Sequence, residues 1–189
     1  MGLRDRQRAD TRQRIQRQAL RLFTDRGYDA TTVNDVAAAA GVSAMTVYRH
    51  FPTKEDLVLY DDFDHLAAAT ISELPATGSL AERIGRTVLA TFDLASTHDR
   101  EILLDRLRLM ISTPALQARH LDSQYRLQEA FVTGIGADDP AAEFQTRAAA
   151  GAVLGVAYTA LLRWAAEDGE SSLPELFREA FTSTFGQSL

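Results

Sequence analysis

The side chains with the clearest chemistry in this sequence lie between Thr31 and Leu57. Within that stretch a short segment brings together a hydroxyl, a phenol and a guanidinium, on Thr46, Tyr48 and Arg49. Such groups bind phosphates and base edges, and the first turn of a helix directs N–H groups at phosphate oxygens. These residue types therefore predict contact with the major groove of DNA.

Two short helices must position these side chains, and the sequence marks their ends. Thr32 followed by Asp35 predicts a capping box at the start of the first helix. Gly41 suits the positive φ that closes a helix, and Ser43 is a typical cap for the next one. The first helix has one apolar face, formed by Val33, Val36, Ala37 and Ala40. The pattern predicts a helix-turn-helix.

In the second helix Val47 and Phe51 share the inner face, and Pro52 ends the helix. Thr53 with Asp56 predicts the cap of a third helix that carries Lys54 near its start. The alternative interpretation is a helical hairpin with a polar outer face and no ligand. The predicted DNA contacts are Thr32, Asn34, Ser43, Ala44, Met45, Thr46, Tyr48, Arg49, His50 and Lys54.

This region resembles the DNA-binding region of the TetR family of transcriptional regulators. The family pattern has a Thr-rich start and an Ala-rich helix, then Gly-Val-Ser, Thr-Val-Tyr, His-Phe and a Lys-Glu-x-Leu cap. Its counterparts here are Thr31-Thr32, residues 35–40, Gly41-Val42-Ser43, Thr46-Val47-Tyr48, His50-Phe51 and Lys54-Glu55-Asp56-Leu57. The resemblance implies a DNA-binding regulator without enzymatic activity. Met45 departs from the family's usual small or charged residue, which leaves the base preference open.

Charge is distributed unevenly along the chain. The first 54 residues carry ten Arg and Lys against five Asp, a net charge of +5, and the remainder carries −11, which gives −6 overall. The electrostatic potential at a DNA phosphate is set mainly by nearby charges, so the negative net charge of the whole chain does not argue against DNA binding. Two interpretations of Arg4, Arg6 and Arg8 stay open, a mobile arm on DNA or a solvated, frayed helix start.

Composition limits the remaining classes. The chain has 189 residues, 46% of them hydrophobic, and no cysteine, which excludes disulfides. No secretory signal is expected at the start, and the apolar run 148–162 is shorter than the ~20 residues of a membrane span, so a cytoplasmic protein is expected. Asp61, Asp62, Asp64 and His65 suit a metal less well than a solvated acidic face. No catalytic grouping is visible, and neither a cofactor nor a metal is expected.

The fold predicted is all-α, with a three-helix DNA-binding domain over residues 1–54 and a helical ligand-binding and dimerisation domain over 55–189. Proline and glycine punctuation predicts helices at about 53–72, 79–97, 99–112, 115–134, 140–167 and 172–185. The last two are apolar enough to form a homodimer through a four-helix bundle, which would read a palindromic operator. The predicted interface is Gly151, Leu154, Gly155, Leu162, Phe177 and Phe181.

The second domain resembles, over residues 99–114, 115–119 and 161–164, a TetR branch that includes the mycofactocin-system regulator and is associated with acyl-CoA-like ligands. A small apolar effector is therefore expected, with Arg106, Arg108 and Arg119 as partners for its phosphate or carboxylate. The alternatives are a different drug-like ligand, no ligand, or plain core packing. The predicted pocket comprises Phe63, Leu66, Leu103, Leu107, Met110, Ile111, Tyr125, Phe131, Tyr158, Leu161 and Trp164. The helix predicted over 53–72 would couple effector to operator.

Overall fold

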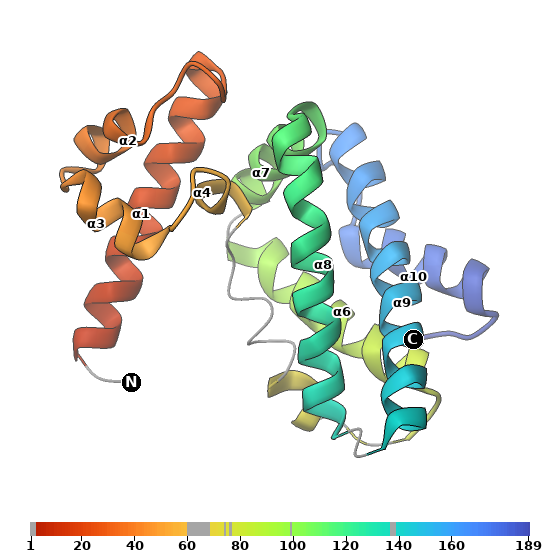
Figure 1. The fold of residues 1–189 in the computed structure, drawn as a ribbon. Helices are drawn as coiled ribbons and strands as arrows, with labels where there is room; N and C mark the ends of the chain where they lie inside the picture. The colour runs from red at the N-terminus through yellow and green to blue at the C-terminus, as the bar shows by residue number, and fades with distance from the viewer. Residues whose placement is uncertain (1–2, 60–68, 74, 76, 99, 137–138) are drawn as a thin grey trace. The chain divides into compact units, whose positions relative to one another are not determined.

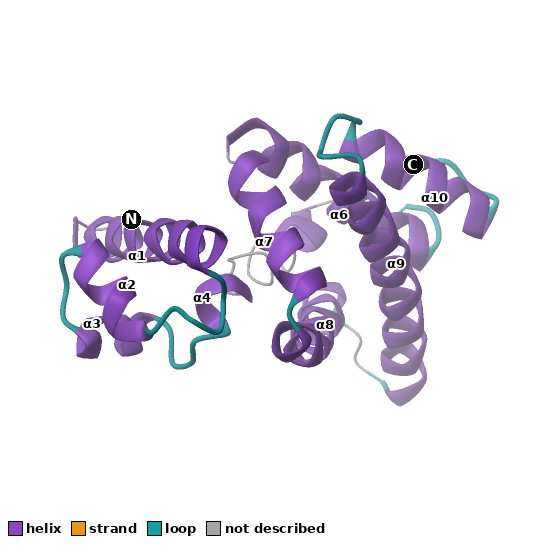
Figure 2. Cartoon of the chain, turned by 90° about the horizontal axis from the view of Figure 1, so that it is seen from above, coloured by secondary structure: helices purple, strands orange, loops and turns teal. Residues whose placement is uncertain are grey.

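The computed structural model describes residues 3–59, 69–73, 75, 77–98, 100–136 and 139–189. These residues form helices joined by loops, and no strand occurs among them, as Figure 2 shows. The all-α prediction is thus confirmed for the described chain. By packing, the chain divides into two units: residues 1–60 with 105–120, and residues 61–104 with 121–189.

The first unit begins with α1 (Leu3–Arg26), α2 (Val33–Ala40), α3 (Ala44–His50) and α4 (Asp56–Leu59) (Figure 1). α1 packs against α2 and α4, and α2 packs against α3. Arg4, Arg6 and Arg8 all lie within α1. The structure therefore favours a helix start over an extended arm for these arginines.

A single apolar core holds these four helices together. The sequence-predicted inner faces of α2 and α3 are confirmed, except that Val33 is only partly buried. Each core side chain is at most 5% exposed, so burial of apolar surface stabilises the arrangement. The core consists of Ile15, Ala19, Leu20, Phe23, Val36, Ala37, Ala40, Val47, Phe51, Leu57 and Val58.

The second unit contains α6 (Leu80–His98), α9 (Pro140–Ala166) and α10 (Leu173–Phe185), with α9 packed against both others. α7 (Arg100–Ser112) begins in this unit and ends in the first, and α8 (Pro114–Ile135) begins in the first and ends in this one. The predicted bounds of these helices are confirmed to within two residues. Of the helix predicted over 53–72, α4 and the helical residues 69–73 are described, and residues 60–68 lie outside the described chain.

Aromatic rings fill the contact between α6 and α10. Phe92 meets Phe177 edge to face with 5.5 Å between ring centroids, and Phe177 lies 6.0 Å from Phe181. Phe177 and Phe181 have no exposed surface, and Leu154 of α9 is 4% exposed. The prediction that these three side chains meet a second copy is therefore corrected, because they form the core of their own chain.

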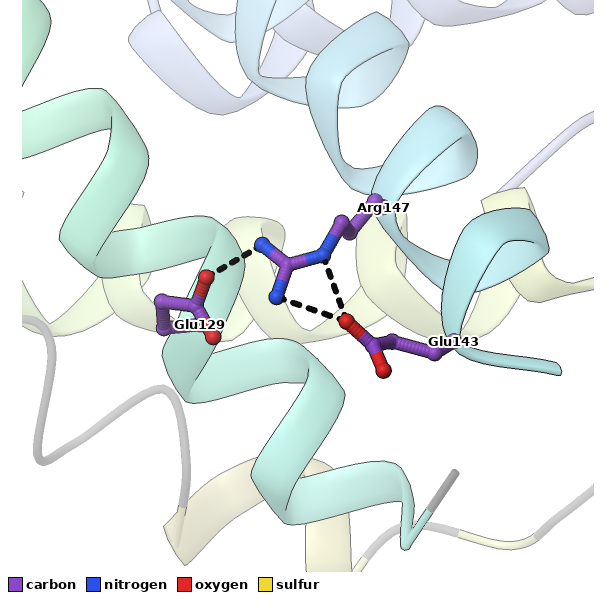
Figure 3. Close-up of polar contacts among 3 residues, drawn as sticks. All are labelled: Glu129, Glu143 and Arg147. Carbon is purple, nitrogen blue, oxygen red and sulfur yellow. Dashed lines mark hydrogen bonds and ion pairs between the residues drawn. The ribbon is translucent and has the colours of Figure 1, made fainter. Parts of the chain in front are cut away.

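α9 is long and apolar enough, by length and composition alone, to qualify as a membrane span. Its packing against α6 and α10 identifies it instead as a partly buried core helix. Arg147 joins it to α8, because the guanidinium donates to Glu143 on α9, with Nη2 at 2.9 Å, and to Glu129 on α8 (Figure 3). The Arg147 bond lowers the pKa of the Glu129 carboxyl. Such exposed charges mainly set the register of the two helices.

Candidate nucleic-acid interface

The turn between α2 and α3 has the caps that the sequence predicts. The Thr32 backbone N–H donates to the Asp35 carboxylate at 2.8 Å, and the Asp35 N–H donates to the Thr32 hydroxyl at 3.2 Å. Gly41 closes α2 with φ +65°. Ser43 accepts from the Thr46 N–H at 3.1 Å and so begins α3. These local bonds fix the direction in which α3 leaves the turn.

α3 presents one face to the core and another to solvent. Val47 is 1% exposed, whereas Met45 is 76% exposed and Tyr48 is 49% exposed. Arg49 is exposed beside them. A short helix with a guanidinium, a phenol and a thioether on its free face can reach base edges and phosphates. Of the predicted contacts on α3, Met45, Tyr48 and Arg49 are therefore accessible on its free face.

The remaining predicted contacts differ in what their side chains already do. Asn34 is exposed and Ala44 is half-buried. The Thr32 hydroxyl is engaged with Asp35, and the Ser43 hydroxyl lies 3.0 Å from the Thr46 hydroxyl. These capping groups retain acceptor or donor capacity, but their first role is to hold the helix ends.

A cationic cluster surrounds the end of α3. Burial, followed by the positive charges of Arg49, Arg8 and Arg12, lowers the pKa of the His50 imidazole. Two of those arginines come from α1, so the helix packing brings α1 charge to the recognition helix. An anion at this point would relieve the repulsion, which is the electrostatic signature of a phosphate position.

Lys54, a predicted DNA contact, makes contacts within its own unit. Its ammonium donates to the Tyr28 carbonyl oxygen at 2.6 Å and lies 4.2 Å from the centroid of the Tyr28 ring and 5.7 Å from that of Phe23. The hydrogen bond and the cation–π contacts tie the start of α4 to the end of α1. The geometry therefore gives Lys54 an internal anchoring role, and the predicted phosphate contact stays a prediction.

Sequence reasoning missed two residues of the α1–α2 loop. Tyr28 is 8% exposed and packs on Phe23 with 5.0 Å between ring centroids, and burial, followed by the Glu55 charge, raises its pKa. Thr31 is 1% exposed and donates to the Gly27 carbonyl at 2.9 Å. An aromatic residue directly after a helix-ending glycine is the only local signal, and it does not identify the partner.

The residues of the predicted effector pocket divide between the two units, and two of them lie outside the described chain. Phe63 and Leu66 lie outside the described chain, as do the four acidic and histidine positions 61, 62, 64 and 65. Leu107, Met110 and Ile111 belong to the first unit, and Leu103, Tyr125, Phe131, Tyr158, Leu161 and Trp164 belong to the second. Ile111 and Tyr125 are 39% and 65% exposed. The pocket stays a prediction.

Trp164 shows how a predicted lining residue is used as core. Its side chain is 2% exposed, and its indole N–H donates to the Ser171 carbonyl at 3.0 Å. The ring also packs against Gly169, where an added Cβ would lie 3.0 Å from it. The ring thus braces the turn between α9 and α10.

The arginines expected to face an effector have other partners. Arg106 donates from Nε to the Val58 carbonyl at 2.7 Å, and Arg108 lies 3.8 Å from the Asp105 carboxylate. Beside Arg108, the first unit has an open cleft of about 390 Å³ that contains none of the predicted pocket residues. Its lining is Phe23, Thr24, Gly27, Tyr28, Asp105, Arg108, Leu109, Ser112 and Thr113.

Comparison with protein families gives two matches. Residues 15–60 match the family described as bacterial regulatory proteins, tetR family. Residues 79–185, more than half of the chain, match the MftR C-terminal domain. The first match covers the capped helices described above, and the second covers α6 to α10.

Individual relatives agree with these matches. A protein of Mycobacterium tuberculosis described as a mycofactocin biosynthesis transcriptional regulator, MftR, is 28% identical over 182 residues, which is 93% of this chain and 90% of the relative. The repressor FadR of Thermus thermophilus, solved with lauroyl-CoA, aligns over 94% of this chain and 95% of its own with a TM-score of 0.55 and 22% identity. NalD, a repressor of a multidrug efflux pump in Pseudomonas aeruginosa, aligns over 96% of both chains with a TM-score of 0.60 and 17% identity. At these identities the two solved structures support the fold alone.

Proposed function

Because the chain belongs to the TetR family of transcriptional regulators and has a C-terminal domain of the MftR type, we propose that it represses a promoter by binding a palindromic operator as a homodimer and that a small apolar effector releases it. The family consists of DNA-binding regulators, so the chain is not an enzyme. Family membership supports a DNA-binding regulator, and the palindromic operator, the homodimer and the effector are our proposals. A protein with this role works in the cytoplasm.

One observation carries the DNA-reading part of the proposal. The free face of α3 exposes Met45, Tyr48 and Arg49, while Val47 on the opposite face is buried. We assign base contacts to Met45 and Arg49, since a thioether can meet a thymine methyl and a guanidinium can bind guanine. Tyr48 and His50 are assigned to phosphates, with Arg8 and Arg12 of α1 adding positive charge.

The dimer part rests on the outer face of α9. Phe144 is 73% exposed, and Ala148, Ala152 and Gly155 are exposed along the same helix. A Cβ added at Gly155 would meet nothing within 4 Å. Soluble proteins usually cover an apolar helix face of this kind, and a second copy would place two recognition helices at a fixed spacing.

The effector part is the least constrained. The lauroyl-CoA found in FadR and the drug-efflux role of NalD suggest two chemistries, an acyl thioester and a drug-like hydrophobe. We favour the acyl-CoA class because the C-terminal match is to the MftR type, and we keep the drug-like class as the alternative. The single tryptophan, Trp164, gives a fluorescence signal for either ligand.

A selection from a pool of random duplexes tests the DNA-binding proposal. The expected result is an inverted repeat with one preferred half-site spacing. Equal retention of all sequences would instead indicate a non-specific, architectural DNA binder, and retention of none at low salt would refute the proposal. Long-chain acyl-CoA is then added to the operator complex. If Trp164 fluorescence shows binding and the operator affinity does not fall, the acyl-CoA class is wrong.

A further inference from the structure

The short helix α4 is held in place by the side chain of Lys54, which precedes it, and by a side chain of α7. At its start, the Lys54 ammonium binds the Tyr28 carbonyl at the end of α1. Within α4, the carbonyls of Val58 and Leu59 accept from Arg106 of α7, from Nε at 2.7 Å and from Nη2 at 3.4 Å respectively. Figure 1 shows α4 beside α7, as these bonds require.

The Arg106 contact suits the chemistry of backbone carbonyl acceptors. A carbonyl oxygen has two lone pairs, so it can accept a hydrogen bond from a side chain. A planar guanidinium can donate to two carbonyls at once, and hydrogen bonds from a charged donor are stronger than those between neutral groups. Arg106 is half-buried, so water competes for these carbonyls less than at a fully exposed site.

The position of α4 bears directly on α3. Leu57 and Val58 of α4 are 0% and 1% exposed, and they are buried in the same unit as Phe51, which directly follows α3. Only five residues separate His50 at the end of α3 from Asp56 at the start of α4. Since a packed core transmits small displacements, a shift of α4 changes the orientation of α3.

We propose that Arg106 is a positioning residue for operator recognition, which holds α4, and through it α3, in the DNA-reading orientation. The inference rests on the proposed function, since it assumes an operator. It deepens that function by naming the side chain through which α7 would act on the DNA-binding helices.

α7 is suited to this role because its first residue, an arginine, also binds the backbone of another segment. Arg100, in its first turn, donates to the carbonyl oxygen of Gly169 in the turn between α9 and α10. The two arginines are six residues apart on one continuous helix, about 9 Å along its axis. A change at the α9–α10 turn can therefore be passed along α7 to α4 without any contact of the effector with DNA.

The test compares Arg106→Gln with Arg108→Gln, which removes the same charge from the same helix at an exposed position paired with Asp105. Fluorescence anisotropy measures binding to the selected palindrome, to the same duplex with one half-site scrambled, and to a random duplex. For Arg106→Gln we expect palindrome affinity to fall by about 5- to 150-fold, the range of a typical coupling energy. Affinity for random duplex should stay within about twofold, because phosphate contacts remain. Arg108→Gln should bind all three duplexes like the wild type.

Three results would overturn the inference. In the first, Arg106→Gln binds the palindrome with wild-type affinity. In the second, it binds all three duplexes more weakly by the same factor while its melting temperature is unchanged. In the third, Arg108→Gln shows the same selective loss of palindrome affinity. If Arg106→Gln does not fold, Arg106→Lys is used to test the inference instead. It keeps the charge and reaches α4 with a single ammonium, so a selective, smaller loss of palindrome affinity is expected, and wild-type affinity contradicts the inference. If the wild type selects no palindrome, the proposed function fails, whereas these three results leave that function intact.

Discussion

The ammonium of Lys54 donates to the carbonyl oxygen of Tyr28 at 2.6 Å and lies over the ring of the same residue, 4.2 Å from its centroid. The bond joins two positions 26 residues apart, one just after α1 and the other just before α4. Lys54 is also the only lysine in the chain. Urea denaturation and the salt dependence of DNA binding, measured on one Lys54 variant, separate its role in stability from a contact with DNA.

We expect Lys54→Ala to lower the free energy of unfolding by about 1 to 3 kcal/mol, because it removes a charge-assisted hydrogen bond and a cation–π contact from a half-buried site. Urea denaturation followed by circular dichroism measures the change. Lys54→Arg serves as the control, since it keeps the charge and can still reach Tyr28. Its free energy of unfolding should fall less than that of Lys54→Ala.

The salt dependence of DNA binding distinguishes anchoring from phosphate contact for Lys54. With an anchoring role, the slope of log K against log salt should be the same for the folded Lys54→Ala protein and the wild type. A slope reduced by about 0.9 for each copy bound would mean that the ammonium neutralises a phosphate, which would support the original prediction from the sequence.

His50 should make operator binding depend on pH. Burial and three neighbouring arginines lower its pKa in the free protein, so the imidazole is neutral near pH 7. A phosphate beside it favours the protonated form and raises the pKa in the complex. Affinity should therefore rise as pH falls from about 8 to 6, by up to about tenfold for each pKa unit gained. Anisotropy titrations of the wild type and His50→Gln measure this pH dependence of operator affinity. If the two proteins show the same pH profile, His50 does not contact a phosphate.

Stability of the free protein should change in the opposite direction. A histidine whose folded pKa lies below its unfolded value of about 6.5 binds protons more readily when the chain is unfolded. Its contribution is therefore present above that pH and is lost as pH falls below it. Thermal melts of the wild type without DNA should show a larger acid-induced loss than melts of His50→Gln.

Gly41 tests the geometry of the turn between the DNA-binding helices. Its φ is +65°, and a Cβ added there would meet nothing within 4 Å. Any cost of Gly41→Ala is therefore backbone strain without steric clash, about 1 to 2 kcal/mol in the left-handed region. Asparagine tolerates that region better, so Gly41→Asn should cost less than alanine. Urea denaturation of both variants measures the difference, and equal costs would mean that a hidden contact, rather than φ, decides the effect.

The local features of this fold could be predicted from the sequence because each depends on neighbouring residues. Thr32 and Asp35 lie within one turn, and Pro140 marks the start of α9 to the residue, with Asp139 accepting from two N–H groups of its first turn. Such signals require only the covalent spacing of a side chain and a backbone group. For this reason the helix bounds and the exposed face of α3 agree with the predictions.

The long-range contacts could not be predicted in the same way. Arg106 and Val58 are 48 residues apart, and an arginine that binds the backbone of a distant helix has the same pattern in sequence as one that faces solvent. The apolar face of α10 presents the same ambiguity. Phe177 and Phe181 are covered by their own chain, although the sequence predicted that a second copy covers them. Periodicity identifies a face to be buried, and it does not identify what buries it.

Gly155 offers a direct test of the proposed dimer. The residue lies within α9, and a Cβ added there would meet nothing within 4 Å among the described residues beyond the adjacent backbone of its own helix. In a monomer Gly155→Ala should therefore stabilise the helix by about 0.5 to 1 kcal/mol, the usual gain in a helix interior.

If a second copy packs closely against this face, the added methyl group pushes the two helices apart and weakens the dimer. We expect analytical ultracentrifugation to show more monomer for Gly155→Ala than for the wild type at the same concentration. We also expect the melting temperature of the wild type to rise with protein concentration more steeply than that of the variant, because association stabilises the folded state. A variant that melts higher than the wild type and sediments identically would mean that no partner touches Gly155.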